Sequence, residues 1–241
     1  MPRFFVENLN PEAPVIIGGD AGHIRRSLRM QPGEEITVCD TKGTDYLCEI
    51  VSFGEERVEL AVKAASRTES EPSVSVTLFQ CNPKGDKLES VIQKSVELGV
   101  CEIIPVLSAR CISRPDAKAA HKKRARYQKI ADSAAKQCGR GILPQVGEQL
   151  AFGQLCGRLA EFDRVLLFYE GGGAALRTLL RDTDRRIAVI IGPEGGFDLD
   201  EVEKLQAAGA VCCGLGRRIL RTETAPLAAL SGIMLLSGNL E

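Results

Sequence analysis

The chain has 241 residues, a hydrophobic fraction of 44% and a formal net charge of -1, which excludes a strongly charged disordered chain and suits one large or two modest packed domains. No apolar run approaches the ~20 residues of a membrane-spanning helix, and the amino-terminal MPRFFVENLN lacks the long apolar core of a secretion signal. These features predict a cytoplasmic protein with no membrane partner.

Short β segments separated by turn signals fill the first 70 residues. Strands are predicted at 3–6, 35–40, 46–51 and 57–62, which indicates a small barrel or sandwich. Between the first two, Gly22–Arg29 is predicted to form a short helix with Ile24 and Leu28 packed inward.

The composition changes after a polar, proline-containing stretch between Ser66 and Ser73. This stretch predicts a domain boundary near residue 70, with one domain at 1–70 and a second at 71–241. An apolar strand at 74–80, a helix with Asp86 and Glu89 as a capping box, and a strand at 101–107 then form a β-α-β unit, which is typical of a parallel sheet.

A long helix is predicted at 117–138, within the most basic part of the chain. Ten Lys or Arg and two Asp lie between Arg110 and Arg140, a local charge of +8 that leaves -9 for the remainder. Such a run is either a solvated helix face or a surface for a phosphate backbone, and the pattern favours RNA contact.

Three predicted strands each end in a glycine-rich or unusual loop. Strand 165–169 precedes three glycines and a helix at 174–180, and strand 187–191 precedes Gly192-Pro193-Glu194-Gly195-Gly196. Strand 210–214 precedes an arginine-rich segment, and the last helix begins near Thr224. Glycines after strands are often plain turns, but ligands of open α/β sheets bind at the carboxyl ends of strands, so we expect a ligand site there.

The cysteines do not suggest a metal centre. There are nine, an odd number without C-x-x-C spacing, and His23 and His121 are the only histidines. We interpret the cysteines as reduced core residues and expect chemistry without a metal.

Two long motifs carry a family resemblance. IGPEGGF followed by a helix and LGRRILRTETA, together with KGDKLESVIQKSVELGVCEIIPV, resembles the small-subunit ribosomal RNA (16S rRNA) uridine-N3 methyltransferases of the SPOUT superfamily. The resemblance implies a trefoil-knotted α/β domain after a small PUA-like β-barrel domain that binds RNA. It also implies S-adenosyl-L-methionine as cofactor, N3 of one uridine in the assembled small ribosomal subunit as target, and a homodimer.

The resemblance also assigns roles to residues. Glu223 and Glu194 are candidate bases, and Arg221 is a candidate for stabilising the uracil anion. Cofactor contacts are expected from Leu167, Phe168, Gly192, Pro193, Glu194, Gly195, Leu215, Gly216, Ile219, Leu220, Arg221 and Thr222. RNA contacts are expected from Arg3, Arg25, Arg29, Lys94, Arg110, Lys122, Lys123 and Arg140.

The chain departs from the family pattern at Ser133 and Lys136, where the family usually has glutamates, and after Arg110, where it usually has serine. Two other functions stay open at this point. One is a phosphate- or nucleotide-binding enzyme that uses the GPEGG loop as an anion cradle, and the other is a non-enzymatic RNA-binding protein.

Overall fold

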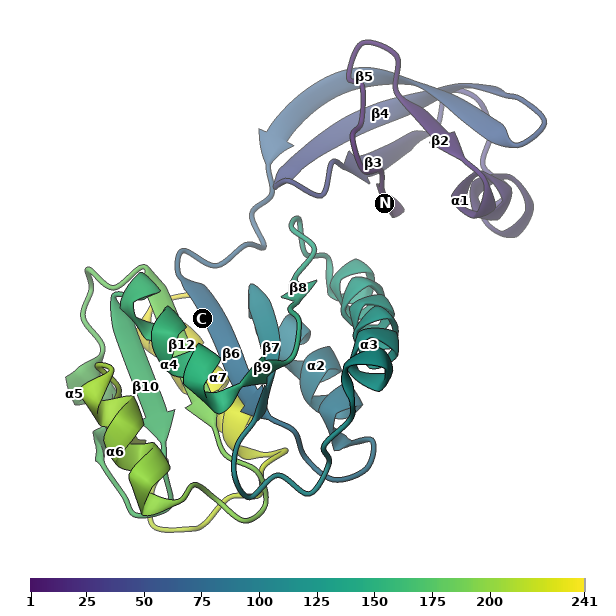
Figure 1. Cartoon of the computed structure of the whole chain (residues 1–241). Helices are drawn as coiled ribbons and strands as arrows, with labels where there is room; N and C mark the ends of the chain where they lie inside the picture. The colour runs from purple at the N-terminus through teal and green to yellow at the C-terminus, as the bar shows by residue number, and fades with distance from the viewer. Residues whose placement is uncertain (241) are drawn as a thin grey trace. The chain divides into compact units, whose positions relative to one another are not determined.

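The computed structural model describes residues 1–240, which form two compact units (Figure 1). The first contains Met1–Glu71 and Ala135–Leu143, and the second contains Pro72–Ala134 and the chain from Pro144 onward.

The first unit is built on a curled, five-stranded sheet. Its strand order is β1-β3-β4-β5-β2, and every pairing is antiparallel except that of β1 with β3. The strands are β1 (Arg3–Phe5), β2 (Val15–Ile17), β3 (Glu35–Cys39), β4 (Thr44–Phe53) and β5 (Arg57–Arg67). Alternate side chains such as Ile36, Val38, Cys48 and Ile50 are fully buried, as expected for a sheet with one face on a core.

Two details of this unit differ from the sequence prediction. The strand β2 was not predicted, because Val15–Ile17 is too short to show an alternating pattern. The predicted helix is α1 (Gly19–Gly22) followed by one π-helical turn, η1 (His23–Ser27). Ile24 is buried as expected, but Leu28 is 40% exposed because the helical turn ends before it.

The second unit contains an eight-stranded sheet, in which seven strands follow the order β11-β13-β10-β12-β6-β7-β8 and the eighth, β9, pairs with β7. Every pairing in it is parallel. The strands are β6 (Ser75–Cys81), β7 (Glu102–Leu107), β8 (Gln145–Val146), β9 (Leu150–Ala151), β10 (Arg164–Phe168), β11 (Ala174–Ala175), β12 (Arg186–Ile191) and β13 (Val211–Gly214). All their carboxyl ends therefore point to one edge of the sheet (Figure 1).

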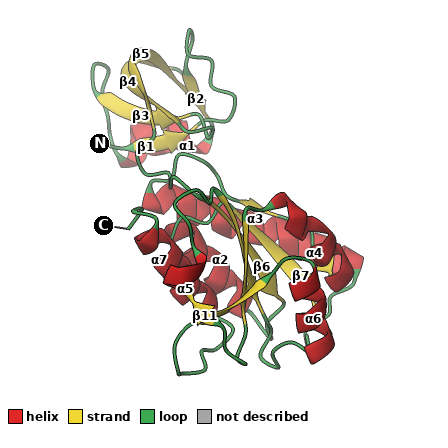
Figure 2. Cartoon of the chain, turned by 90° about the vertical axis from the view of Figure 1, so that its left-hand side faces the viewer, coloured by secondary structure: helices red, strands yellow, loops and turns green. Residues whose placement is uncertain are grey.

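Helices cover the parallel sheet on both sides. They are α2 (Lys87–Glu97), α3 (Ala117–Cys138), α4 (Phe152–Arg158) with the 3-10 turn η2 (Leu159–Glu161), α5 (Leu176–Leu179), α6 (Leu199–Ala207) and α7 (Ala225–Leu236). Figure 2 shows α2, α5 and α7 on one side and α4 and α6 on the other. The central strands β6, β7, β10 and β12 are buried on both faces, which explains their nearly continuous apolar sequences.

The predicted β-α-β unit and the helix at 117–138 are confirmed. The capping box at Asp86 is wrong: its side chain makes no cap, and Glu89 instead pairs with Arg126 of α3 at 2.7 Å. The helix predicted at 174–180 is also only partly correct, since β11 takes its first two residues. None of the helices within residues 1–240 is long and apolar enough to cross a membrane.

A buried ion pair holds the returning segment Ala135–Leu143 in the first unit. Arg140 donates from Nε and Nη2 to the Glu71 carboxylate, both at 2.9 Å, and the amides of Gly141 and Ile142 donate to Glu71 at 2.7 and 3.1 Å. The side chains are only 4% and 11% exposed. Burial alone would raise the pKa of Glu71, but the Arg140 guanidinium and these amides outweigh it and lower the pKa.

We predict that Glu71→Gln lowers the stability of the protein by about 3 kcal/mol near pH 7, because it leaves the Arg140 charge buried without its partner. A lowered pKa in the folded state means that the contribution of Glu71 is fully present above its ordinary pKa of about 4.3 and is lost as the pH falls below it. Denaturant titrations from pH 7 to pH 3 should therefore show the difference between variant and wild type shrinking at the acidic end. The exposed pair Lys94–Glu97 gives the control, Glu97→Gln, with an effect below about 0.5 kcal/mol. A pH-independent difference would contradict the assignment.

Candidate functional site

Loops from the carboxyl ends of β10, β12 and β13 surround an open cavity of about 460 Å³. A cavity of this size is within the usual range for a small-molecule site. Three segments supply nearly all of its wall: 168–172, 191–196 and 213–222. Lys87 and Ala225 add to it from the starts of α2 and α7.

Glycines in these loops have conformations that other residues avoid. Gly196 has φ +66°, and a Cβ on it would overlap the carboxylate of Glu170. Gly216 has φ +94°, with open space where a Cβ would point. At both positions the chain can turn sharply and place backbone amides and carbonyls against a ligand.

One buried hydrogen-bond chain joins two of the loops. The Thr222 hydroxyl donates to the carbonyl oxygen of Gly192 at 2.7 Å, and Gln80 Nε2 at the end of β6 donates to the same hydroxyl oxygen at 3.0 Å. Gln80 is completely buried and Thr222 is 6% exposed. The segment after β13 is therefore attached to the ends of β12 and β6, although these strands are not its neighbours in sequence.

Lys87, the first residue of α2, joins the two candidate bases. Its Nζ lies 3.2 Å from Glu194 Oε1 and 3.2 Å from Glu223 Oε2. Hydrogen bonds from Glu194 and then Glu223 raise the pKa of Lys87. Burial tends to raise the pKa of Glu194, but hydrogen bonds from its own amide, from the Lys84 amide and from Lys87 outweigh it and lower this pKa. A carboxylate with a lowered pKa is a weak proton acceptor, so Glu194 is a weaker general base than the sequence suggested.

Arg110 holds the GPEGG loop and the start of α6 through two contacts. Its Nε lies 2.5 Å from Asp198 Oδ1, and its Nη1 donates to the Gly195 carbonyl at 2.8 Å. The Glu201 carboxylate accepts from the amide of Asp198, as the predicted cap of α6 requires, and also from the amide of Ala109. The loop is thus held between the end of β7 and the start of α6.

The structure brings most of the expected cofactor residues together. Eleven of the twelve line the cavity, and the exception is Leu167, which is fully buried inside β10. Of the three catalytic candidates, Glu194 and Arg221 line the cavity, whereas Glu223 lies behind Lys87. The fold therefore brings most of these candidate residues together at the carboxyl ends of the parallel strands.

The expected RNA-binding residues are more scattered. Arg25 and Arg29 are exposed on the first unit, and Lys122 and Lys123 are exposed on α3. Lys94 pairs with Glu97 on α2, and Arg3 pairs with Asp45 at 2.8 Å. Burial of Arg140 against Glu71 is at odds with the prediction that it contacts RNA, because the guanidinium is committed to the unit's own interior.

Sequence reasoning missed several residues of the cavity wall. Tyr169, Glu170 and Gly172 follow β10, where the triple glycine was the available signal, and Arg217 lies within the RRILRTE segment. Lys87 was not among the expected site residues. Nothing in the sequence indicates that the start of α2 reaches the loops after β12 and β13.

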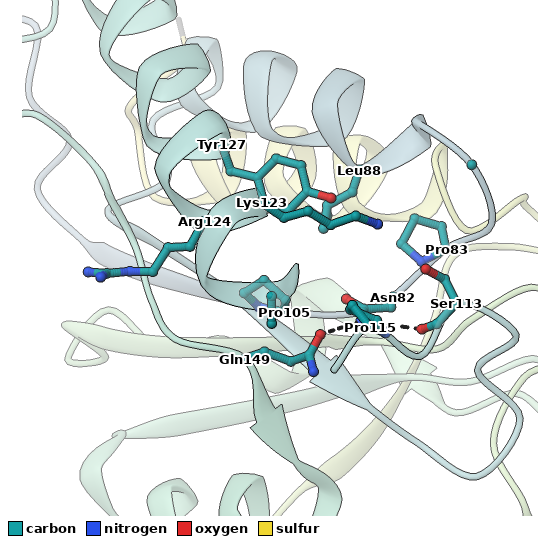
Figure 3. Close-up of a pocket in the computed structure, with 12 residues that line it drawn as sticks. Asn82, Pro83, Leu88, Pro105, Ser113, Pro115, Lys123, Arg124, Tyr127 and Gln149 are labelled. Carbon is teal, nitrogen blue, oxygen red and sulfur yellow. Dashed lines mark hydrogen bonds between the residues drawn. The ribbon is translucent and has the colours of Figure 1, made fainter. Parts of the chain in front are cut away.

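A second, narrower cleft lies beside the end of β6 between α2 and α3 (Figure 3). Asn82 donates to Gln149 at 2.7 Å across its floor, and Tyr127 and Lys123 lie above them. Its free volume of about 10 Å³ is room for about one water molecule. This cleft is therefore a packed junction of the fold, and the larger cavity is the candidate site. No group of three or more His, Cys, Asp or Glu side chains suited to a metal was found within residues 1–240.

Known families match both units. The family described as "RNA methyltransferase domain" matches residues 69–234, and the one described as "RNA methyltransferase PUA domain" matches residues 16–63. These matches confirm the expected fold class, a SPOUT-type α/β domain preceded by a PUA-like β domain.

Full-length relatives agree with these matches. The chain is 39% identical to ribosomal RNA small subunit methyltransferase E of Bacillus subtilis, over 97% of this chain and 96% of the relative. It is similar to the crystal structure of that enzyme from Neisseria gonorrhoeae bound to S-adenosyl methionine, with a TM-score of 0.84, 34% identity and 98% of each chain covered. A Legionella pneumophila methyltransferase in complex with the same cofactor has a TM-score of 0.81 and 28% identity, with 97% of this chain and 96% of that chain covered.

We predict that Thr222→Val loosens the segment 215–224, because the variant cannot donate to Gly192 and removes one of the two acceptors of the buried Gln80 amide, the other being the Cys81 carbonyl. The expected loss of stability is about 1–3 kcal/mol. Hydrogen exchange followed by mass spectrometry should show faster exchange in residues 192–196 and 215–224. Thr224→Val is the matched control, because the Thr224 side chain is exposed and does not cap α7. Equal protection in both variants would contradict the role given to Thr222.

Proposed function

The chain belongs to the ribosomal RNA small subunit methyltransferase E family of RNA methyltransferases, and on this premise we propose that it methylates N3 of a specific uridine in 16S rRNA, within the assembled small subunit. The observation that carries the proposal is the single cavity formed by the loops after β10, β12 and β13, which contains eleven of the twelve residues expected to contact the methyl donor.

The cavity fits S-adenosylmethionine in size and in chemistry. It combines apolar side chains, including Phe168, Leu215 and Ile219, with glycine backbone that a Cβ would obstruct or strain. Apolar walls with a few polar groups suit an adenine ring and its ribose. When bound, the donor supplies a methyl group on a positively charged sulfur, so the chain itself has to orient the two substrates and assist proton loss.

The acceptor nitrogen of uracil carries a proton that has to leave. N3 forms the new bond to the methyl carbon, the carbon–sulfur bonding pair remains on sulfur, and the N3 proton passes to a base or to water. Glu194 and Glu223 are the carboxylates in contact with Lys87 of the cavity wall, and Arg221 is a cation in the same wall. We assign Arg221 to stabilising the uracil anion. Of the two candidate bases, Glu194 lines the cavity, whereas Glu223 lies behind Lys87.

RNA binding is assigned to basic surfaces of both units. Arg25 and Arg29 in the PUA-like unit and Lys122 and Lys123 on α3 are exposed cations suited to phosphate contact. The cytoplasm, where small ribosomal subunits are found, is the proposed location. We also propose a homodimer, since Leu235 and Leu236 at the end of α7 are 57% and 48% exposed.

The cavity wall disfavours the two other functions. Glu194 is at the centre of the GPEGG loop, and the loop lacks the Gly-Lys-Ser/Thr sequence typical of a phosphate-binding loop. A purely RNA-binding protein has no use for a cavity of about 460 Å³ enclosed by three glycine-containing loops.

We predict that the protein binds S-adenosylmethionine in calorimetry. We also predict that it adds one methyl group to the 16S rRNA of small subunits purified from cells that lack this protein. Methylation at N3 blocks base pairing, so reverse transcription should stop at the modified uridine only after treatment. Mass mapping of nuclease fragments identifies the nucleoside. Donor binding without rRNA methylation would support the donor site but contradict the proposed substrate. Absence of donor binding would contradict both the donor site and the proposed substrate.

We predict that the purified chain sediments as a dimer at micromolar concentration. Leu235→Glu should shift it toward the monomer, because a charge at an apolar interface is costly to bury. Leu199→Glu is the control, since Leu199 is 69% exposed on α6. A wild-type monomer at this concentration would refute the dimer.

A further inference from the structure

Two side chains of opposite charge lie next to each other in the wall of the donor cavity. Lys87 and Glu194 both line it, and Lys87 Nζ is 3.2 Å from Glu194 Oε1. Their side chains are 33% and 30% exposed, so each is partly buried and still open to a ligand. They come from different parts of the chain, the start of α2 and the loop after β12.

Other contacts fix this pair in place. Glu223 Oε2 lies 3.2 Å from the same ammonium and is itself buried. The Lys84 amide donates to Glu194 Oε1 at 3.0 Å. The ammonium and the carboxylate are therefore oriented before any substrate binds, which is the condition for precise recognition of a small ring.

The order of donor and acceptor in the pair complements one face of uracil. Uracil presents N3–H, a donor, next to carbonyl oxygens, which are acceptors. Cytosine has a donor amino group where uracil has O4, and its N3 is an acceptor. A carboxylate facing N3 beside an ammonium facing a carbonyl therefore accepts uracil and opposes cytosine.

We propose that Lys87 and Glu194 form the subsite for the acceptor base: the Lys87 ammonium donates to a uracil carbonyl oxygen, and the Glu194 carboxylate accepts from N3–H. Glu223 holds the Lys87 side chain in position through its contact with the ammonium. This inference rests on the proposed function and adds to it the residues that select uracil.

The subsite also assists the reaction. When N3–H is lost, negative charge moves onto the carbonyl oxygens of the ring, and a fixed ammonium against one of them stabilises that charge. The charged groups around Lys87 are Glu194 and Glu223, in contact with it, and Glu170, Arg217, Arg218 and Arg221 in the same cavity wall. Glu194 orients the ring more than it holds the proton, in keeping with its lowered pKa.

The test is Lys87→Met in the full chain, with unmodified small subunits and S-adenosylmethionine. We expect kcat to fall about 100-fold, as for the loss of one group that stabilises developing negative charge. The pH at which kcat reaches half its maximum should move upward, because the uracil N3–H is no longer acidified. The calorimetric Kd for the donor should stay within about threefold of wild type, because Lys87 contacts the acceptor base. Lys87→Arg retains the cation and should recover most of the rate.

Lys204→Met is the matched control, because Lys204 is an exposed lysine on α6 of the same unit. It should change neither kcat nor the pH profile. Glu194→Gln is the second variant, expected to lower kcat/KM about tenfold, because it loses a charged hydrogen-bond acceptor.

Two results would overturn the subsite. One is a Lys87→Met enzyme with wild-type kcat and pH profile, and the other is a loss of donor binding that accounts for its whole loss of activity. Failure of the proposed function has a different signature, since the wild type itself would then transfer no methyl group to the subunit.

Discussion

The hydrogen bond from the Thr222 hydroxyl to the Gly192 carbonyl is the contact on which the site depends. A parallel sheet places all its strand ends at one edge, but it does not by itself make their loops meet. Thr222 joins the segment after β13 to the end of β12, and Gln80 extends the connection to β6. These two bonds are buried, where losing one partner is costly, so they hold the loops with little freedom. The cavity exists because this connection closes it.

Charge makes a second connection between the same elements. Lys87 neutralises carboxylates from both loops, and Arg110 holds the GPEGG loop through Gly195 and Asp198. All five charged side chains, Lys87, Glu194, Glu223, Arg110 and Asp198, are partly exposed, so each pair alone contributes little to global stability. These ion pairs instead fix the positions of the charges around the cavity, whose wall contains glycine backbone. An ordered set of charges is what methyl transfer to a weakly acidic ring nitrogen needs.

Much of this arrangement was predictable from local sequence. The apolar run Ile187–Ile191 followed by glycine predicts a buried strand and a ligand loop, and the helix predicted from about 117 to 138 is present. Contacts between distant segments were not predictable. Lys87 is about 107 residues from Glu194, and Arg140 was assigned to RNA because nothing in the sequence shows that Glu71 lies against it. The capping box at Asp86 failed for the same reason, since Glu89 pairs with Arg126 of α3 instead.

The most direct test of this account is a crystal structure of the protein with S-adenosylmethionine. The account predicts that the donor occupies the cavity between the loops after β10, β12 and β13, with its methyl group directed toward Lys87 and Glu194. A donor bound elsewhere, or bound in this cavity with its methyl group directed away from that pair, would contradict it.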